Sequence, residues 1–148
     1  MKPPPLPPRD TSLPCWTMSD ATLTGGCHCG AVRYRIEGPI LYAGICHCAS
    51  CRRTAGAESV GWLTVASTDF TQLAGDPARY NSSPGVTRTF CPNCGTTLTY
   101  QTDPESIDVT LASLDDPEAV PPTQESWLSH RLTWNARNPD LPGYPERG

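Results

Sequence analysis

Residues 46–51 read Cys46-His47-Cys48-Ala49-Ser50-Cys51, and this stretch has two counterparts elsewhere in the chain. The counterparts are Cys27-His28-Cys29 and Cys91-Pro92-Asn93-Cys94-Gly95. Together the three stretches hold seven of the eight cysteines of a 148-residue chain, and Cys15 stands alone near the N-terminus. Eight cysteines are too many for ordinary packing, yet they fall short of the content above about 8–10% that is typical of disulfide scaffolds. The clusters therefore need a chemical explanation.

Three interpretations of these cysteines compete: disulfide bonds, redox or simply buried thiols, and metal ligands. Disulfides need an oxidising compartment, of which the sequence gives no sign, and cysteines two apart in a strand have poor geometry for a bridge. A single Cys-x-x-Cys is typical of a redox pair, but that interpretation does not account for three clusters. Zinc accounts for all three, because it binds thiolates tetrahedrally at Zn–S distances of about 2.3 Å.

Four of the thiols are predicted to form a closed zinc site: Cys27, Cys29, Cys91 and Cys94. In an extended Cys-x-Cys both thiols lie on one face. The Cys-Pro-x-Cys-Gly stretch has the form of a zinc knuckle, in which a tight turn presents two thiols and Gly95 takes the left-handed conformation that follows. Such a closed site is structural, and its metal contributes about 10–16 kcal/mol of apparent binding energy to folding.

The remaining cluster, Cys46, Cys48 and Cys51, has three thiols rather than four. Zinc with three protein ligands keeps one coordination position open for water or substrate, which is the pattern of catalytic zinc. The alternative is that a fourth protein ligand comes from elsewhere, either His130 or a carboxylate. The count of thiols thus separates an expected structural site from an expected catalytic one.

The side chains beside the thiols are interpreted as follows. His28 and His47 are not expected to bind metal, because the middle residue of an extended Cys-x-Cys points away from its neighbours. Both are expected at the surface or in support of the ligands from behind. Arg52 and Arg53, which directly follow Cys51, either contact an anionic thiol substrate beside the open zinc or are solvated.

The charge of the chain excludes some partners. The formal net charge is −4, and zinc would bring it to −7, because the four-thiolate site adds −2 and the three-thiolate site adds −1. An acidic chain is not expected to bind nucleic acid or an anionic membrane as its main partner. No apolar run approaches the roughly 20 residues of a transmembrane helix.

The pattern from residue 21 to residue 148 predicts one mainly β domain. Apolar and polar residues alternate with period two over 32–36, 97–100 and 107–111, and residues 60–65 are predicted to be a more fully buried strand. A short helix that runs through Ala55 fits the residues after Cys51. Six of the 17 prolines lie in the first 14 residues, so residues 1–20 are predicted to be a Pro-rich disordered tail. This tail lacks the apolar stretch of a signal peptide, and Met18 is a candidate for the true start.

Three motifs resemble those of the glutathione-dependent formaldehyde-activating enzyme family, which also contains centromere protein V. The motifs are residues 24–34, 46–52 and 88–96, in the family's order and spacing, and Trp134 with Leu141-Pro142 is similar to the family's usual ending. The resemblance covers about residues 21–145. It implies a zinc-bound, mostly antiparallel fold of small β-sheets, of the mss-four-like type. It also implies that the four-thiol cluster holds a structural zinc and that the three-thiol cluster holds the catalytic one.

The activity that the resemblance implies joins glutathione to formaldehyde and gives S-hydroxymethylglutathione. The predicted protein is a cytoplasmic, zinc-dependent carbon–sulfur lyase or synthase with two Zn²⁺ per chain, which adds a low-molecular-weight thiol to formaldehyde or another small carbonyl. Zinc suits this reaction, because coordination lowers the pKa of a thiol so that a thiolate exists at neutral pH. The alternatives are a non-catalytic zinc module that binds a partner protein and, as a weaker idea, a zinc reservoir.

Overall fold

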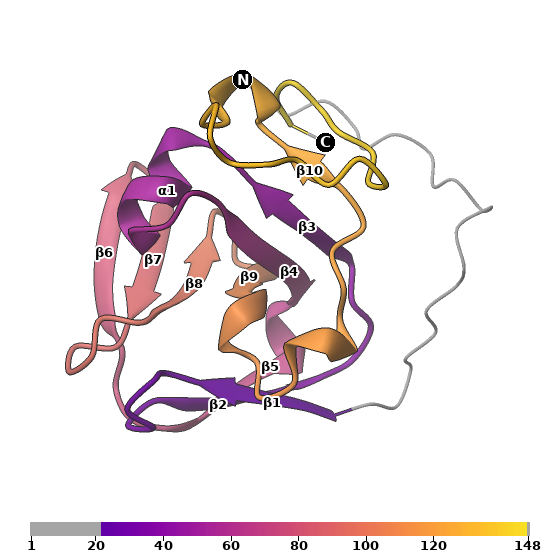
Figure 1. Ribbon diagram of the computed structural model, residues 1–148. Coiled ribbons are helices and arrows are strands. Elements are labelled where there is room, and N and C mark those ends of the chain that lie inside the picture. The colour runs from indigo at the N-terminus through magenta and orange to yellow at the C-terminus, as the bar shows by residue number, and fades with distance from the viewer. Residues whose placement is uncertain (1–21, 148) are drawn as a thin grey trace.

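The structure, a computed structural model, describes residues 22–147, and within them the strands form two sheets (Figure 1). The small sheet has the order β1 (Thr22–Gly26), β2 (Arg33–Glu37) and β5 (Phe70–Ala74). The large sheet has the order β10 (Glu125–Ser126), β3 (Tyr42–Cys46), β4 (Val60–Ala66), β9 (Ser106–Thr110), β8 (Thr97–Gln101), β7 (Val86–Phe90) and β6 (Ala78–Ser83). Its strand pairs are antiparallel apart from β10 and β3, which are parallel. The predicted mainly β, mostly antiparallel fold is confirmed.

Helical structure is sparse in the described residues. One α-helix, α1 (Ala49–Ala55), contains Cys51 and ends at Ala55, where a short helix is expected. Four 3₁₀ turns complete the set: η1 (Ser67–Asp69), η2 (Leu111–Ser113), η3 (Pro117–Ala119) and η4 (Leu128–His130). No helix in this part of the chain is long and apolar enough to cross a membrane. The tail predicted over residues 1–20, with Cys15 and Met18, lies outside the described residues.

The main core lies between the two sheets. Tyr34 and Ile36 of β2 are buried, and the arginines that alternate with them are only half-buried, as period two predicts. They join a cluster that includes Leu63 and Val65 of β4 and Val109 of β9. Strand β4 also buries residues of its other face, as expected for the more fully buried strand.

The other face of the large sheet carries a row of polar and aromatic side chains. The strand register places Tyr42 opposite Thr64, Thr64 opposite Asp108, Asp108 opposite Tyr100, and Tyr100 opposite Arg88. We call these five residues the transverse row. Cys46 lies four residues beyond Tyr42 on β3, so the alternation of strand side chains puts it on the same face.

A β-bulge in β8 makes this row possible. Thr97 pairs with Phe90 and Thr99 pairs with Thr89, so Leu98 is an extra residue in the strand. Leu98 packs in the core between the sheets, whereas Tyr100 packs against Cys51, Val60 and Trp62. A regular strand would place Leu98 and Tyr100 on one face; the extra residue separates them.

Candidate metal centres

Two turns bring the four-thiol cluster together. Cys27 directly follows β1, and its carbonyl accepts a hydrogen bond from Gly30 N at 3.0 Å. Cys91 directly follows β7, and its carbonyl accepts from Gly95 N at 2.9 Å. Gly30 and Gly95 have φ of 78° and 80°, a conformation that glycine adopts without strain. The turn at Cys91–Gly95 is the tight turn that the sequence predicts. The extended segment expected at Cys27–Cys29 is wrong, because the chain turns there and Gly30 N bonds back to the Cys27 carbonyl.

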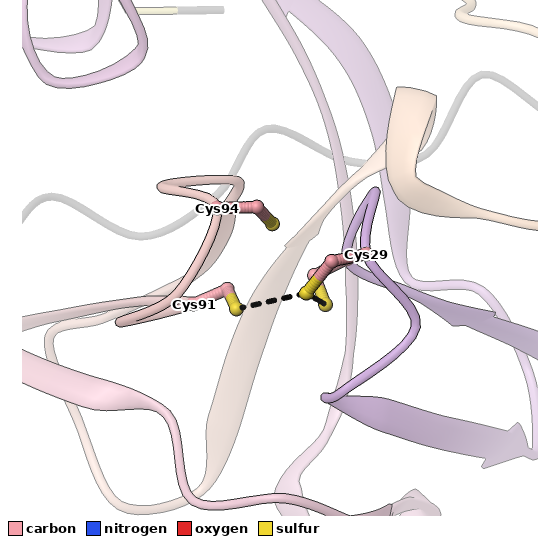
Figure 2. A group of neighbouring side chains, drawn as sticks. Cys29, Cys91 and Cys94 are labelled. Atoms are coloured by element: carbon pink, nitrogen blue, oxygen red, sulfur yellow. Dashed lines mark hydrogen bonds between the residues drawn. The ribbon is translucent and has the colours of Figure 1, made fainter.

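The thiols of Cys27, Cys29, Cys91 and Cys94 all lie within 4.8 Å of one another. Figure 2 labels three of these residues, Cys29, Cys91 and Cys94. The Sγ atoms of Cys27 and Cys29 are 3.5 Å apart, and those of Cys29 and Cys91 are 3.8 Å apart. A tetrahedron with Zn–S distances of about 2.3 Å has sulfur–sulfur edges of about 3.8 Å. All seven cysteines of the described residues are free thiols. This donor set therefore fits Zn²⁺.

The two knuckle thiols differ in pKa: backbone hydrogen bonds lower that of Cys91, but burial and the thiols of Cys27 and Cys94 raise it to about 11 overall, whereas hydrogen bonds to Cys94 favour its thiolate. Thr96 donates to Sγ of Cys94 through its hydroxyl, over 3.3 Å, and through its backbone, and these contacts lower the pKa of Cys94 to about 5. On the opposite turn, Val32 N donates to Sγ of Cys27 over 3.2 Å. Burial raises the pKa of Cys27, but this and other hydrogen bonds outweigh burial, so the pKa is lowered. Thiolates are the form of cysteine that binds metal.

The three-thiol cluster lies where β3 passes into α1. Cys46 is the last residue of β3, Cys48 is the N-cap of α1, and Cys51 is buried in the first half of that helix. Their thiols lie within 4.8 Å of one another. The backbone N–H of Cys51 donates to Sγ of Cys48 over 3.3 Å. The helix start thus turns the third thiol back toward the first two.

One thiol of this cluster carries the negative charge. Hydrogen bonds from the thiols of Cys46 and Cys51 lower the pKa of Cys48 to about 2. The pKa of Cys46 is raised, because its thiol donates to Cys48 and Cys51. A preformed anionic cluster of soft ligands suits Zn²⁺, so this donor set fits the metal as well.

The cluster contains three protein ligands within the described residues. No histidine or carboxylate atom of residues 22–147 lies within 4.8 Å of all three thiols. His130, one of the expected sources of a fourth ligand, is exposed and packs against Trp127 in a tilted arrangement with ring centroids 5.1 Å apart. The fourth-ligand alternative therefore has no support from His130 in this structure.

The expected anion contacts lie on α1. Arg53 is exposed, and Arg52 is half-buried with a buried Nε that has no hydrogen-bond partner among the described residues. Neither forms an ion pair with a carboxylate of residues 22–147. Their contact with a substrate stays a prediction.

The two histidines of the Cys-x-Cys motifs differ. His28 is exposed, as expected. His47 is 1% exposed, so its placement at the surface was the wrong alternative. Its ring lies within contact of Glu125, with Nε2 3.4 Å from Oε1 of that carboxylate. The sequence carries no signal for this contact, because the two residues are 78 positions apart.

Sequence reasoning missed Arg88 as a residue of the site. Arg88 is 6% exposed, and its guanidinium lies 4.6 Å from the ring centroid of Tyr100. Its Nε donates to the Ser82 hydroxyl at 3.2 Å, and it forms no ion pair with a carboxylate of the described residues. Tyr100 in turn packs against the hydrophobic cluster that contains Cys51, as Cys46 and Cys48 also do. A buried cation without a carboxylate partner thus lies beside the thiols.

Asp108 is the acidic member of the transverse row. It accepts a hydrogen bond from the Thr64 hydroxyl, and burial raises its pKa. Burial also raises the pKa of Tyr100, whose hydroxyl therefore keeps its proton at neutral pH. The surface next to the three-thiol cluster offers a cation, a hydroxyl donor and a carboxyl group in line.

The fold and the two clusters define a class: small β proteins with two cysteine sites suited to metal. Residues 22–130 match the glutathione-dependent formaldehyde-activating enzyme family, and the chain belongs to this family. A protein of Halomonas elongata, named as a candidate glutathione-dependent formaldehyde-activating enzyme, is 32% identical over 84% of this chain and 89% of its own length. A crystal structure of a Rhodobacter sphaeroides protein is similar with a TM-score of 0.53 and 29% identity, over 62% of this chain and 87% of that one.

Proposed function

We propose that the protein is a zinc-dependent enzyme of the carbon–sulfur lyase type, which adds a low-molecular-weight thiol to formaldehyde or another small carbonyl. The carbon–sulfur bond forms as the carbonyl π bond breaks, and the thiol proton ends on the former carbonyl oxygen. With glutathione and formaldehyde the product is S-hydroxymethylglutathione. The observation that carries this proposal is a three-thiol cluster with no fourth protein ligand nearby in residues 22–147.

The metals have separate places in this proposal. Cys27, Cys29, Cys91 and Cys94 would hold a structural zinc, and Cys46, Cys48 and Cys51 would hold the catalytic one. When bound there, zinc supplies a Lewis acid that lowers the pKa of a thiol and polarises a carbonyl oxygen. The four-thiol set has no free position, so the reaction belongs to the three-thiol set.

The transverse row is the surface on which the chain would bind and orient the thiol. The guanidinium of Arg88 is positioned to attract a carboxylate of the substrate, because it lies over the Tyr100 ring and forms no ion pair with a carboxylate of the described chain. The hydroxyl of Tyr100 is a hydrogen-bond donor at neutral pH. Holding both reactants close together supplies much of the rate, since the uncatalysed addition is limited by encounter and orientation.

The compartment follows from the same chemistry. Free thiols and an open zinc site persist where the environment is reducing. We therefore place the protein in the cytoplasm, with a small thiol and an aldehyde as its partners and no nucleic acid or membrane.

The function is tested by carbon NMR on the zinc-loaded protein with ¹³C-formaldehyde and a series of thiols. Exchange between free formaldehyde and its thiol adduct should be faster with protein than without it, for at least one thiol. Exchange at the uncatalysed rate with every thiol would contradict the enzyme and favour the zinc module that binds a partner protein. Cys48→Ser, which should stay folded with one zinc, is the matched control and should not accelerate exchange.

A further inference from the structure

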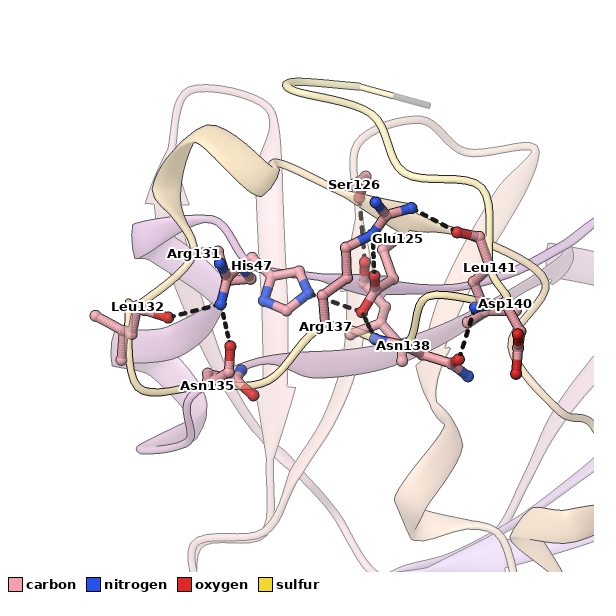
Figure 3. A network of polar contacts seen from close by, with 11 residues as sticks. His47, Glu125, Ser126, Arg131, Leu132, Asn135, Arg137, Asn138, Asp140 and Leu141 are labelled. Carbon is pink, nitrogen blue, oxygen red and sulfur yellow. Dashed lines mark hydrogen bonds and ion pairs between the residues drawn. The ribbon is translucent and has the colours of Figure 1, made fainter.

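A buried carboxylate lies directly behind the three-thiol cluster. Glu125 of β10 is 2% exposed, and its Oε1 lies 3.4 Å from Nε2 of His47, the residue between Cys46 and Cys48 (Figure 3). Its other oxygen accepts from Nε of Arg137 at 3.0 Å. A carboxylate this deeply buried is costly unless it is paired and hydrogen-bonded. These contacts therefore fix the positions of the groups that make them.

The backbone of the same residue joins the C-terminal segment to the cluster. Glu125 N donates to the Pro142 carbonyl, and the Glu125 carbonyl accepts from Tyr144 N, both at 2.9 Å. Ser126 pairs with Cys46 in the parallel β10–β3 ladder, and His47 N donates to the Ser126 carbonyl at 3.0 Å. The Cys46–Cys48 segment is thus held through its backbone and through one side chain.

The four-thiol cluster has no such attachment. Its two turns are closed by their own backbone hydrogen bonds, and the residues that contact its thiols come from the same turns. Glu125 makes no hydrogen bond to either turn among the described residues. A change at Glu125 is therefore expected to reach one cluster and not the other.

We propose that Glu125 is a positioning residue, which holds the Cys46–Cys48 segment in its metal-binding geometry through His47. The C-terminal segment, residues 125–146, thereby sets how firmly the three-thiol cluster retains metal. This inference uses the zinc assignment of the proposed function but not its reaction. Glu125 does not contact substrate in this role; it acts through the histidine between two ligands.

The test is Glu125→Gln in the full-length zinc-loaded protein, with zinc release to a chromophoric chelator as the readout. Glutamine keeps the shape of the side chain but weakens its contacts with His47 and Arg137. Wild-type protein should release zinc in two phases, one from each cluster. The variant should speed the phase from the three-thiol cluster by at least about tenfold, as is typical when a supporting contact of a metal site is lost, and leave the other phase unchanged. Glu118→Gln, which changes an exposed glutamate, is the matched control.

Three further outcomes complete the test. Equal acceleration of both phases, or no acceleration, would overturn the proposal, and so would a wild-type protein that holds a single zinc. If Glu125→Gln does not fold, Arg137→Gln serves instead, because Arg137 is 40% exposed and its loss weakens the network while Glu125 stays in place. The same selective acceleration is expected there, and its absence contradicts the proposal. Zinc release is measured without thiol or aldehyde, so failure of the proposed reaction would leave this result interpretable.

Discussion

Cys48 and Cys94 each carry a lowered pKa, but they belong to clusters with different expected tasks. Cys94→Ser should abolish folding at pH 7, because losing a site of about 10–16 kcal/mol removes as much as the whole stability of a typical domain. Cys48→Ser should leave the chain folded with one zinc and no thiol–formaldehyde activity. Circular dichroism, zinc content and the NMR exchange rate measure the three quantities. If Cys48→Ser unfolds the chain equally, the three-thiol cluster is structural and the enzyme proposal fails.

Arg88 is expected to bind the carboxylate of the thiol substrate. Arg88→Gln should raise KM about tenfold or more for a thiol that carries a carboxylate, as expected for one lost charged hydrogen bond. The KM of neutral 2-mercaptoethanol should change little. Arg88→Lys should recover part of the loss, since it keeps the charge but loses the planar stacking on Tyr100.

Arg53→Gln is the matched control for this series. Arg53 is exposed on α1, and it was a candidate for the same contact on sequence grounds. If KM for carboxylate thiols rises in Arg53→Gln but not in Arg88→Gln, the anion contacts Arg53 of the helix, and the assignment to Arg88 is wrong.

Single residues divide into those that spacing predicts and those that need the fold. The seven clustered cysteines are predictable, because motifs of three to six residues fix which thiols can meet. Arg88 and Glu125 are not, since Arg88 lies among threonines in a strand and Glu125 meets His47 only through the parallel β10–β3 pair. Long-range pairing, rather than residue type, gives these two side chains their place.

At the scale of elements, Asp115 fastens the small sheet to the chain that follows β9. It accepts hydrogen bonds from Arg33 of β2 and from the Thr24 hydroxyl of β1 at 2.6 Å, and Arg33 first and Thr24 second lower its pKa to about 2. Both partners of the ion pair are more than a third exposed, so solvent screens it. Asp115→Asn should therefore destabilise the protein by no more than about 1 kcal/mol.

The sign of the pH dependence follows from the lowered pKa. The ionised form of Asp115 is favoured in the folded state, so its contribution is complete above the unfolded pKa of about 4 and is lost as pH falls toward 2. Between roughly pH 5 and pH 8, Asp115 is ionised in both the folded and the unfolded state. The difference in melting temperature between wild type and Asp115→Asn should therefore be constant over that range. A difference that changes across that range would contradict this account.

The elements themselves were largely predictable. Strands appear at 33–37, 97–101 and 106–110, where alternation of apolar and polar residues indicates them, and at 60–66, where a more fully buried strand is expected. The bulge at Leu98 was not predictable, because the alternation of apolar and polar residues does not indicate an extra residue in a strand. That bulge turns Tyr100 toward the three-thiol cluster, so the row beside the site depends on an irregularity of one strand.

In the whole molecule, the four-thiol cluster lies between the two sheets, whereas the three-thiol cluster lies at the end of one strand. The four-thiol cluster joins the turn between β1 and β2 of the small sheet to the turn between β7 and β8 of the large one. The three-thiol cluster lies at the end of β3, beside the transverse row and the C-terminal segment. Metal at the first cluster would clip the two sheets together. The second cluster lies within the large sheet and its helix, and it adjoins the polar groups of the transverse row.

X-ray absorption at the zinc edge, combined with the zinc content of the full-length chain, tests this division most directly. Two zinc ions per chain with four and three cysteine ligands give an average of about 3.5 sulfurs at about 2.3 Å per zinc. The account predicts that average, together with a nitrogen or oxygen neighbour at the second zinc. One zinc per chain with four sulfurs would contradict it, and so would two zinc ions that both have four protein sulfurs.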